Sequence, residues 1–285
     1  MFAMKKILIF IGLTYGLAWG IWLIAYLMGR GLNVLVLVLA MFAPALAFLV
    51  LRIFSKGQVE LGADFRLHLR ESWGYFLLAL WGPAILTVLA YLLYFLAFPK
   101  EFVLSSSVFS LAKKAGVPAS LIILSSLFRV LTLGPLINTF VAIGEEIGWR
   151  GYLFPTLKQQ FSPWSAHLLV GLIWSLWHLP INLQGYNYGL AYADQPWLGI
   201  LAMFLFCFGL SVCLSYLVEK TGSIWSAALL HGSLNGWASF TTLFALKANH
   251  LILGPFLNGL ISCLPLLVLA IYLLNKERGT AYGLR

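Results

Sequence analysis

Ionisable and amide side chains stand inside apolar stretches at three places along the sequence. They are Glu145, Glu146, Arg150, His178, His231 and Asn235. A charged side chain costs at least about 2.5–3.5 kcal/mol at the centre of a bilayer, so each such group is a functional candidate. A carboxylate, two imidazoles and an amide could activate a water molecule and stabilise the oxyanion formed when it attacks a carbonyl. The set therefore favours peptide hydrolysis. The alternative is a buried polar network that only locks helices together.

Helical spacing groups the two carboxylates with the arginine. Glu146 and Arg150 are four residues apart and share a helix face, which predicts an ion pair. Glu145 lies about 100° around the helix from Glu146, so the two carboxylates cannot both point the same way. One carboxylate is tied to arginine and the other is free for chemistry, but the spacing alone does not choose between them.

The two histidine segments supply the remaining parts. Trp174 stands one turn before His178, where its ring could form an apolar wall beside the imidazole. His231 and Asn235 are four residues apart and share a face. Hydrogen-bond donors aimed at a developing oxyanion are worth about 3–4 kcal/mol each in acyl transfer. These segments are therefore predicted to meet in one polar pocket.

The composition places the chain in a membrane. Of its 285 residues, 61% are hydrophobic and 9% are charged, whereas soluble domains average about 45–50% and about 25%. A soluble fold of this size could not hide so much apolar surface, so the lipid bilayer must act as its solvent. The net charge of +9 is spread over short loops without a basic run, which excludes nucleic acid as a partner.

The apolar runs predict an all-α fold, a polytopic bundle of about eight transmembrane helices in a single membrane domain, 1–285. A span needs about 20 mostly apolar residues. Runs of that kind cover 7–28, 33–54, 73–98, 119–157, 163–182, 197–218, 223–245 and 251–274. The fourth run must stay helical to about Leu157 if Glu145 is to reach the depth of the histidines. The mixed charges of the loop 55–72 predict an amphipathic surface helix.

The distribution of Lys and Arg predicts that both termini are cytoplasmic. In that orientation the cytoplasmic side carries twelve of them: Lys5, Lys6, Arg52, Lys56, Arg66, Arg70, Arg150, Lys158, Lys220, Lys276, Arg278 and Arg285. The opposite side carries five: Arg30, Lys100, Lys113, Lys114 and Lys247. The chain is thus expected to be an integral, multi-pass membrane protein, in the cell membrane if its source is a prokaryote.

The three polar segments resemble the signatures of the CAAX-protease and bacteriocin-processing (CPBP or Abi) family of intramembrane proteases, which includes type II CAAX endopeptidases. Those signatures are two glutamates with an arginine four residues after the second, an aromatic residue four before a histidine, and His-x-x-x-Asn or Asp. This sequence has Glu145-Glu146-Ile147-Gly148-Trp149-Arg150, Trp174-Ser175-Leu176-Trp177-His178 and His231-Gly232-Ser233-Leu234-Asn235, in that order. The resemblance covers 119–245, a CAAX-protease-like catalytic core.

The resemblance implies catalytic roles for four of these residues. Glu145 would act as general base, and His178 would help it to activate water. His231 and Asn235 would form the oxyanion hole.

Three further residues would shape the site or bind substrate. Glu146 and Arg150 would pair, and Arg150 would also be available to contact substrate. Trp174 departs from the family, which usually has Phe there, so a larger aromatic ring is expected to reshape the pocket without removing its chemistry.

No cofactor is expected, because the resemblance favours a water activated by glutamate. The alternative is zinc, held by Glu145, His178 and His231 with a fourth position left open. The sequence has no His-Glu-x-x-His motif.

The function expected from the sequence is that of an intramembrane endopeptidase. Its partners would be the lipid bilayer and a membrane-associated protein or peptide, cleaved near the cytoplasmic face. The alternatives are a non-catalytic scaffold or bacteriocin self-immunity protein that keeps the pocket, or a proton-coupled transporter that uses the polar cluster as a relay. The substrate, its prenylation and the oligomeric state are left open by the sequence.

Overall fold

The computed structural model describes residues 2–281, and its regular elements within that range are all helical, as predicted. The α-helices are α1 (Phe2–Leu27), α2 (Val34–Met41), α3 (Ala43–Phe54), α4 (Leu69–Ala97), α5 (Ser106–Ala115), α6 (Ala119–Leu131), α7 (Leu133–Glu146), α8 (Phe154–Lys158), α9 (Pro163–Trp177), α10 (Leu179–Leu183), α11 (Trp197–Thr221), α12 (Ile224–Thr241) and α13 (Leu264–Ala281). Two 3₁₀ segments, η1 (Pro99–Glu101) and η3 (Ala248–His250), and one π-helix, η2 (Ile147–Leu153), complete them. Arg285, counted above on the cytoplasmic side, lies outside the described residues.

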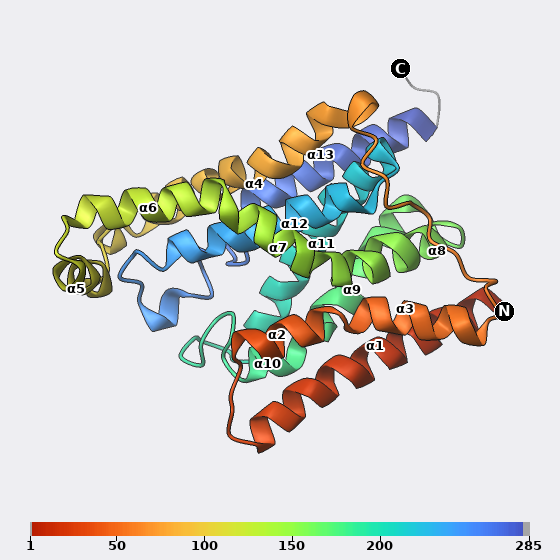
Figure 1. Cartoon of the computed structure of the whole chain (residues 1–285), viewed down its shortest axis with the longest axis horizontal. Coiled ribbons are helices and arrows are strands. Elements are labelled where there is room, and N and C mark those ends of the chain that lie inside the picture. Colours follow the sequence, from red (N-terminus) through yellow and green to blue (C-terminus); the bar gives the residue numbers. More distant parts are fainter. Residues whose placement is uncertain (1, 282–285) are drawn as a thin grey trace.

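The centre of the bundle consists of α7, α9, α11 and α12 (Figure 1). Helices α1, α2 and α3 pack on one side of this centre, and α4 and α13 pack on the other. Large apolar side chains nevertheless point outward: Leu35 is 67% exposed, Phe54 83% and Leu96 77%. So much outward apolar surface would be unfavourable in water and suits contact with lipid. The chain is an integral membrane protein.

Four segments are long and apolar enough to cross a membrane by themselves. They are Met4–Leu27, Val34–Phe54, Leu69–Ala97 and Trp197–Thr221. The number rises to five if α5 and α6, which meet at 104°, are one broken span. The sequence predicted about eight. Three of the other predicted runs, 119–157, 163–182 and 251–274, are interrupted in the fold by turns or by changes of helix type. The fourth, 223–245, contains the continuous helix α12, whose polar side chains lower its hydropathy.

The last predicted span, 251–274, begins later than expected. Residues 251–263 form turns, and the helix α13 starts at Leu264. Gly254 has φ +157°, and a Cβ there would lie 2.2 Å from Oγ of Ser262. The chain therefore folds back on itself at a position that only glycine accommodates. This fold-back prevents a helix from forming before Leu264.

The prediction of an amphipathic helix over 55–72 was wrong for most of that loop. Residues 55–68, here called the strap, are irregular, and α4 starts only at Leu69. The strap is held by backbone bonds instead: Gly62 N–H donates to the carbonyl of Gly151 at 2.8 Å, and Asp64 N–H donates to the carbonyl of Gly222 at 3.0 Å. These bonds fasten the strap to η2 and to the turn between α11 and α12.

The helix that carries the two glutamates continues as predicted, past Leu157 to Lys158, by way of η2 and α8. The π-helical turns of η2 follow Glu146 directly. Helix α7 lies very close to α12, because a Cβ at Gly232 would be 2.4 Å from the backbone N of Thr139. Glycine permits this approach, which brings two site-bearing helices together.

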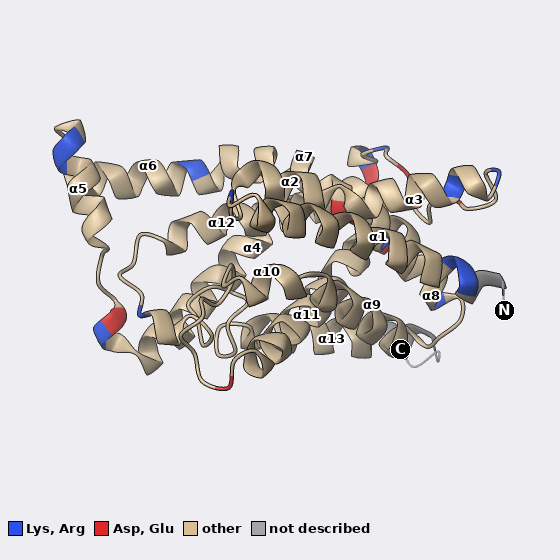
Figure 2. Cartoon of the chain, turned by 90° about the horizontal axis from the view of Figure 1, so that it is seen from below, with Lys and Arg blue, Asp and Glu red and all other residues tan. Residues whose placement is uncertain are grey.

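Charged residues gather mainly toward the two ends of the molecule, as Figure 2 shows. One end carries the strap, α8 and the start of α1, and the other carries α5. The start of α1 and the end of α13 lie at the same end (Figure 1). The long axis between these ends is the direction in which the apolar helices run.

Candidate active site

The indole of Trp174 lies at the centre of the candidate site. Its Nε1 donates to Oε2 of Glu145 at 2.7 Å, and Nε1 of Trp149 donates to the same oxygen at 3.2 Å. Glu145 is only 2% exposed. Two N–H donors offset part of the cost of burying a carboxylate. Because both donate to Oε2, the other oxygen, Oε1, is left for a water or a substrate atom.

Glu146 is bound to both Arg150 and His231. Its Oε1 accepts from Nη1 of Arg150 at 3.2 Å and from Nδ1 of His231 at 2.7 Å. All three residues are at most 5% exposed. The predicted ion pair between Glu146 and Arg150 is thus confirmed, and the bond to His231 is an addition that the spacing within one helix could not indicate.

His178 is held in one tautomer when its ring is neutral. It follows the last residue of α9, and its Nδ1 lies 2.9 Å from the backbone carbonyl oxygen of Trp174. A carbonyl oxygen only accepts, so Nδ1 carries the hydrogen and Nε2 is an acceptor. An imidazole nitrogen of this kind can receive a proton or a hydrogen bond from water.

The other polar groups surround Trp174 as well. Its ring centre lies 6.0 Å from that of His178 and 5.5 Å from that of His231. The guanidinium carbon of Arg150 lies 4.1 Å from the same ring. Residues from η2, α9 and α12 therefore converge on one side chain. Asn235, one turn beyond His231 on α12, is half-buried, and no hydrogen bond joins it to these groups within residues 2–281.

Sequence reasoning missed two hydrogen-bond donors. It treated Trp174 as an apolar wall, whereas its N–H binds Glu145, and it gave Trp149 no role at all. Phenylalanine has no such donor, so a signal was present in the departure from the family pattern. Trp149 is also four residues after Glu145, the spacing at which helical side chains meet.

A zinc site is not assembled in this arrangement. No group of three or more His, Cys, Asp and Glu side chains in the described part of the chain is placed to hold a metal ion. The alternative ligands Glu145, His178 and His231 do not form such a group. Glu145 receives indole donors, and His231 directs Nδ1 at Glu146.

Comparison with known proteins agrees with the segments identified above. Residues 127–237 match the family model described as type II CAAX prenyl endopeptidase Rce1-like. This segment is similar to the CAAX protease family. A curated relative from Methanococcus maripaludis (strain DSM 14266), CAAX prenyl protease 2, is 34% identical over 93 residues, which are 32% of this chain and 34% of that protein. The match thus spans about a third of the relative's length.

The Rce1-like segment includes every residue of the candidate site, from Glu145 to Asn235. Helices α1 to α5 and α13 lie outside this segment. The match therefore covers the inner helices of the bundle.

Proposed function

We propose that the chain is an intramembrane endopeptidase that hydrolyses a peptide bond of a membrane-associated protein or peptide. The observation that most supports this is that Glu145 and His178 are both hydrogen-bonded to Trp174. Glu145 accepts from the indole N–H, and His178 donates to the backbone carbonyl. Each residue keeps one acceptor atom free of these bonds, Oε1 of Glu145 and Nε2 of His178. A water held between two such acceptors is the nucleophile that peptide hydrolysis requires.

In the proposed reaction, Oε1 of Glu145 takes one proton from the water. The other hydrogen of the water is donated in a hydrogen bond to Nε2 of His178. The water oxygen forms a bond to the carbonyl carbon of the substrate, and the carbonyl oxygen becomes an oxyanion. The C–N bond then breaks, and the proton on Glu145 passes to the leaving amine. No covalent bond between enzyme and substrate is needed.

Asn235 and His231 are proposed to stabilise the oxyanion. The Nδ1 hydrogen of His231 is used by Glu146, so His231 can donate from Nε2 only as an imidazolium. Glu145, Glu146 and Arg150 together carry one net negative charge, which a protonated His231 would balance. Glu146 thus serves the oxyanion hole through His231 as well as holding Arg150.

We further propose that the chain crosses the membrane about eight times, with both termini cytoplasmic, and that it lies in the cell membrane if its source is prokaryotic. Two features support this topology. The start of α1 and the end of α13 lie at one end of the molecule (Figure 1), and charged residues gather at both ends (Figure 2). Shorter inner helices that are shielded by others need less apolar surface than lipid-facing ones.

The test is cleavage of peptide reporters by the purified chain in detergent, with paired prenylated and unprenylated reporters. Glu145→Gln removes the base but keeps the side chain's shape, so cleavage should fall to background while folding is retained. Glu71→Gln, an exposed glutamate at the start of α4, is the matched control and should cleave normally. Cleavage that persists in Glu145→Gln would contradict the assignment. A chelator arm tests the zinc alternative, because a water activated by glutamate needs no metal.

The same variant separates hydrolysis from a scaffold function. A scaffold needs the fold and the surface but not the base, so Glu145→Gln would then restore the phenotype of a deletion strain. For a protease, this variant should fail to restore it, whereas Glu71→Gln should succeed.

A further inference from the structure

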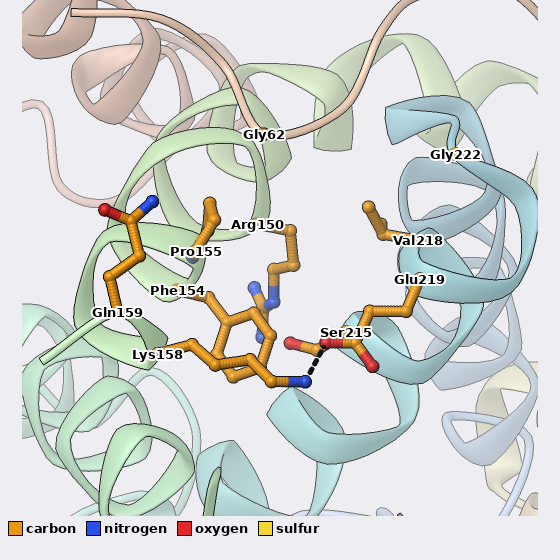
Figure 3. A pocket seen from close by; sticks show the side chains of 10 residues that line it. All are labelled: Gly62, Arg150, Phe154, Pro155, Lys158, Gln159, Ser215, Val218, Glu219 and Gly222. Atoms are coloured by element: carbon orange, nitrogen blue, oxygen red, sulfur yellow. Dashed lines mark hydrogen bonds and ion pairs between the residues drawn. The ribbon is translucent and has the colours of Figure 1, made fainter. Parts of the chain in front are cut away.

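A cavity of about 320 Å³ lies beside the candidate active site, and Arg150 is one of the residues that line it. It is formed between α8 and the last turns of α11, and Gly62 of the strap closes part of it. Figure 3 shows Arg150 reaching into the space between these helices. Lys158 and Glu219 face each other across it, with Nζ and Oε1 2.6 Å apart.

Arg150 has two donors that no group in residues 2–281 accepts. Nη1 binds Glu146, but Nε and Nη2 are buried and have no hydrogen-bond partner among the described residues. These two N–H groups lie along one edge of the planar guanidinium and point the same way. That edge matches the two oxygens of a carboxylate or phosphate.

A second polar atom in the cavity is also unpaired. Ser215 lines the cavity, is 1% exposed, and its Oγ has no partner in the described structure. Leaving a buried donor unsatisfied is costly, and more so for a charged group. Glu219 would repel an anion, but Lys158 neutralises it at the mouth.

We propose that this cavity binds a compact oxyanion, a carboxylate or a phosphate group, through Nε and Nη2 of Arg150 and Oγ of Ser215. The site is separate from the proposed hydrolytic water and does not depend on hydrolysis. The volume is ample for such a group, since a water takes about 30 Å³ in the liquid. The mouth lies beside Lys158 and Glu219, whose side chains are 33% and 37% exposed. The anion therefore enters from the aqueous side, as a free ion or as a lipid headgroup.

Anion binding in this cavity would affect the active site through Trp174. The guanidinium of Arg150 lies 4.1 Å from the Trp174 ring, whose N–H holds Glu145. An anion that fixes the free edge of Arg150 therefore also fixes the surface against which this indole packs.

The test measures thermal unfolding of the purified full chain. In detergent, inorganic phosphate is compared with chloride at equal ionic strength; in nanodiscs, phosphatidylcholine is compared with phosphatidylcholine containing phosphatidic acid. A ligand that binds only the folded state raises the melting temperature with its concentration. A rise with inorganic phosphate identifies a free anion as sufficient, and a rise with phosphatidic acid alone identifies a lipid headgroup. No rise in either arm overturns the proposal.

Variants localise the effect to the cavity. Ser215→Asp places a carboxylate beside Arg150, so the apparent affinity for phosphate should fall at least tenfold while stability without phosphate is kept. Ser215→Leu fills the same space with an apolar group, and it serves if the aspartate variant does not fold. Lys220→Gln removes an exposed lysine on the same helix, outside the cavity lining, and should respond like the unmodified chain. An undiminished response in the folded Ser215 variant would show that phosphate acts elsewhere.

Discussion

Nδ1 of His231 lies 2.7 Å from Oε1 of Glu146, the same oxygen that receives Nη1 of Arg150 at 3.2 Å. One buried carboxylate oxygen therefore serves two cationic or cation-forming groups from different helices. The arrangement connects η2 with α12 at the base of the proposed oxyanion hole. Glu146 is thus assigned a structural and electrostatic task, which leaves Glu145 as the proposed base.

The first prediction concerns the two neighbouring glutamates. Glu146→Gln removes the charge that compensates Arg150, and an uncompensated buried charge costs about 3–5 kcal/mol. The variant should therefore lose much of its unfolding free energy. Glu145→Gln, which keeps that pair, should unfold close to the unmodified chain. Thermal unfolding in detergent compares the two, and equal stability would show that Glu146 is not the main partner of Arg150.

The second prediction concerns the indole donors. Trp174→Phe keeps an aromatic ring but removes the N–H that binds Glu145, and a hydrogen bond to a charged group contributes about 1.5–3 kcal/mol. The variant should lose stability in that range and lose peptide cleavage as the base becomes less well held. Trp177→Phe is its matched control, because Nε1 of Trp177 is buried without a partner in the described structure. Both variants lose similar ring volume, but only Trp174→Phe loses a hydrogen bond, so Trp177→Phe should be destabilised less.

The third prediction concerns Asn235. As a proposed donor to the oxyanion it acts only when negative charge develops, so Asn235→Ala should lower kcat by about 10²–10³-fold with little change in KM. Ser239→Ala, one turn further along α12 at an exposed position, should leave both constants unchanged. A change in KM without a change in kcat would indicate that Asn235 binds the substrate and does not stabilise the transition state.

The fourth prediction concerns pH and lies at the other end of the molecule, in η1. Glu101 is 3% exposed and accepts from Oη of Tyr94 and Nδ1 of His250, each at 2.5 Å. Burial raises the pKa of the Glu101 carboxyl, but these hydrogen bonds and the nearby positive groups outweigh it, so its pKa lies below the usual value.

A carboxyl pKa that is lower in the folded state stabilises the fold at pH values above the unfolded pKa, which is about 4.3 for glutamate. This contribution is lost as the pH falls through the folded pKa. Glu101→Gln should therefore be less stable at pH 7 by about 1.5–3 kcal/mol. Its deficit should shrink toward pH 3. Unfolding followed at a series of pH values gives the two curves, and a constant gap between them would rule out titration of Glu101 as the cause.

The fold class and the residues of the candidate site could be predicted from the sequence because both depend on local patterns. Apolar runs reveal helices that face lipid, and the four-residue spacing of Glu146 and Arg150 gave their ion pair correctly. The bond from His231 to Glu146 joins residues 85 positions apart and depends on how α7 and α12 pack. The same holds for Trp174 and Glu145, whose contact requires α9 to cross the end of α7 at a particular height.

Two errors in the predicted elements have a common physical origin. Hydropathy measures whether a residue prefers lipid or a protein interior, and apolar turns satisfy it as well as helices do. Residues 251–263 are apolar but fold as turns, because Gly254 and Ser262 meet closely. Backbone N–H groups of the strap donate hydrogen bonds to the carbonyl oxygens of Gly151 and Gly222. No periodicity within residues 55–68 can specify these partners.

The wide turns of η2 hold one additional residue without changing the register of the helix around it. A π-helical turn closes its hydrogen bonds over five residues, where an α-helix uses four, so it accommodates one additional residue. Deleting one residue between Ile147 and Leu153 would remove that residue, so an ordinary α-helical turn would form and α8 would keep its register. Lys158 would still face Glu219, and a crosslink between cysteines at these two positions would still form. The same deletion in the α-helical part of α7 would rotate everything after it by about 100°, so proteins that share this site are expected to tolerate a deletion in η2 more readily than one in α7.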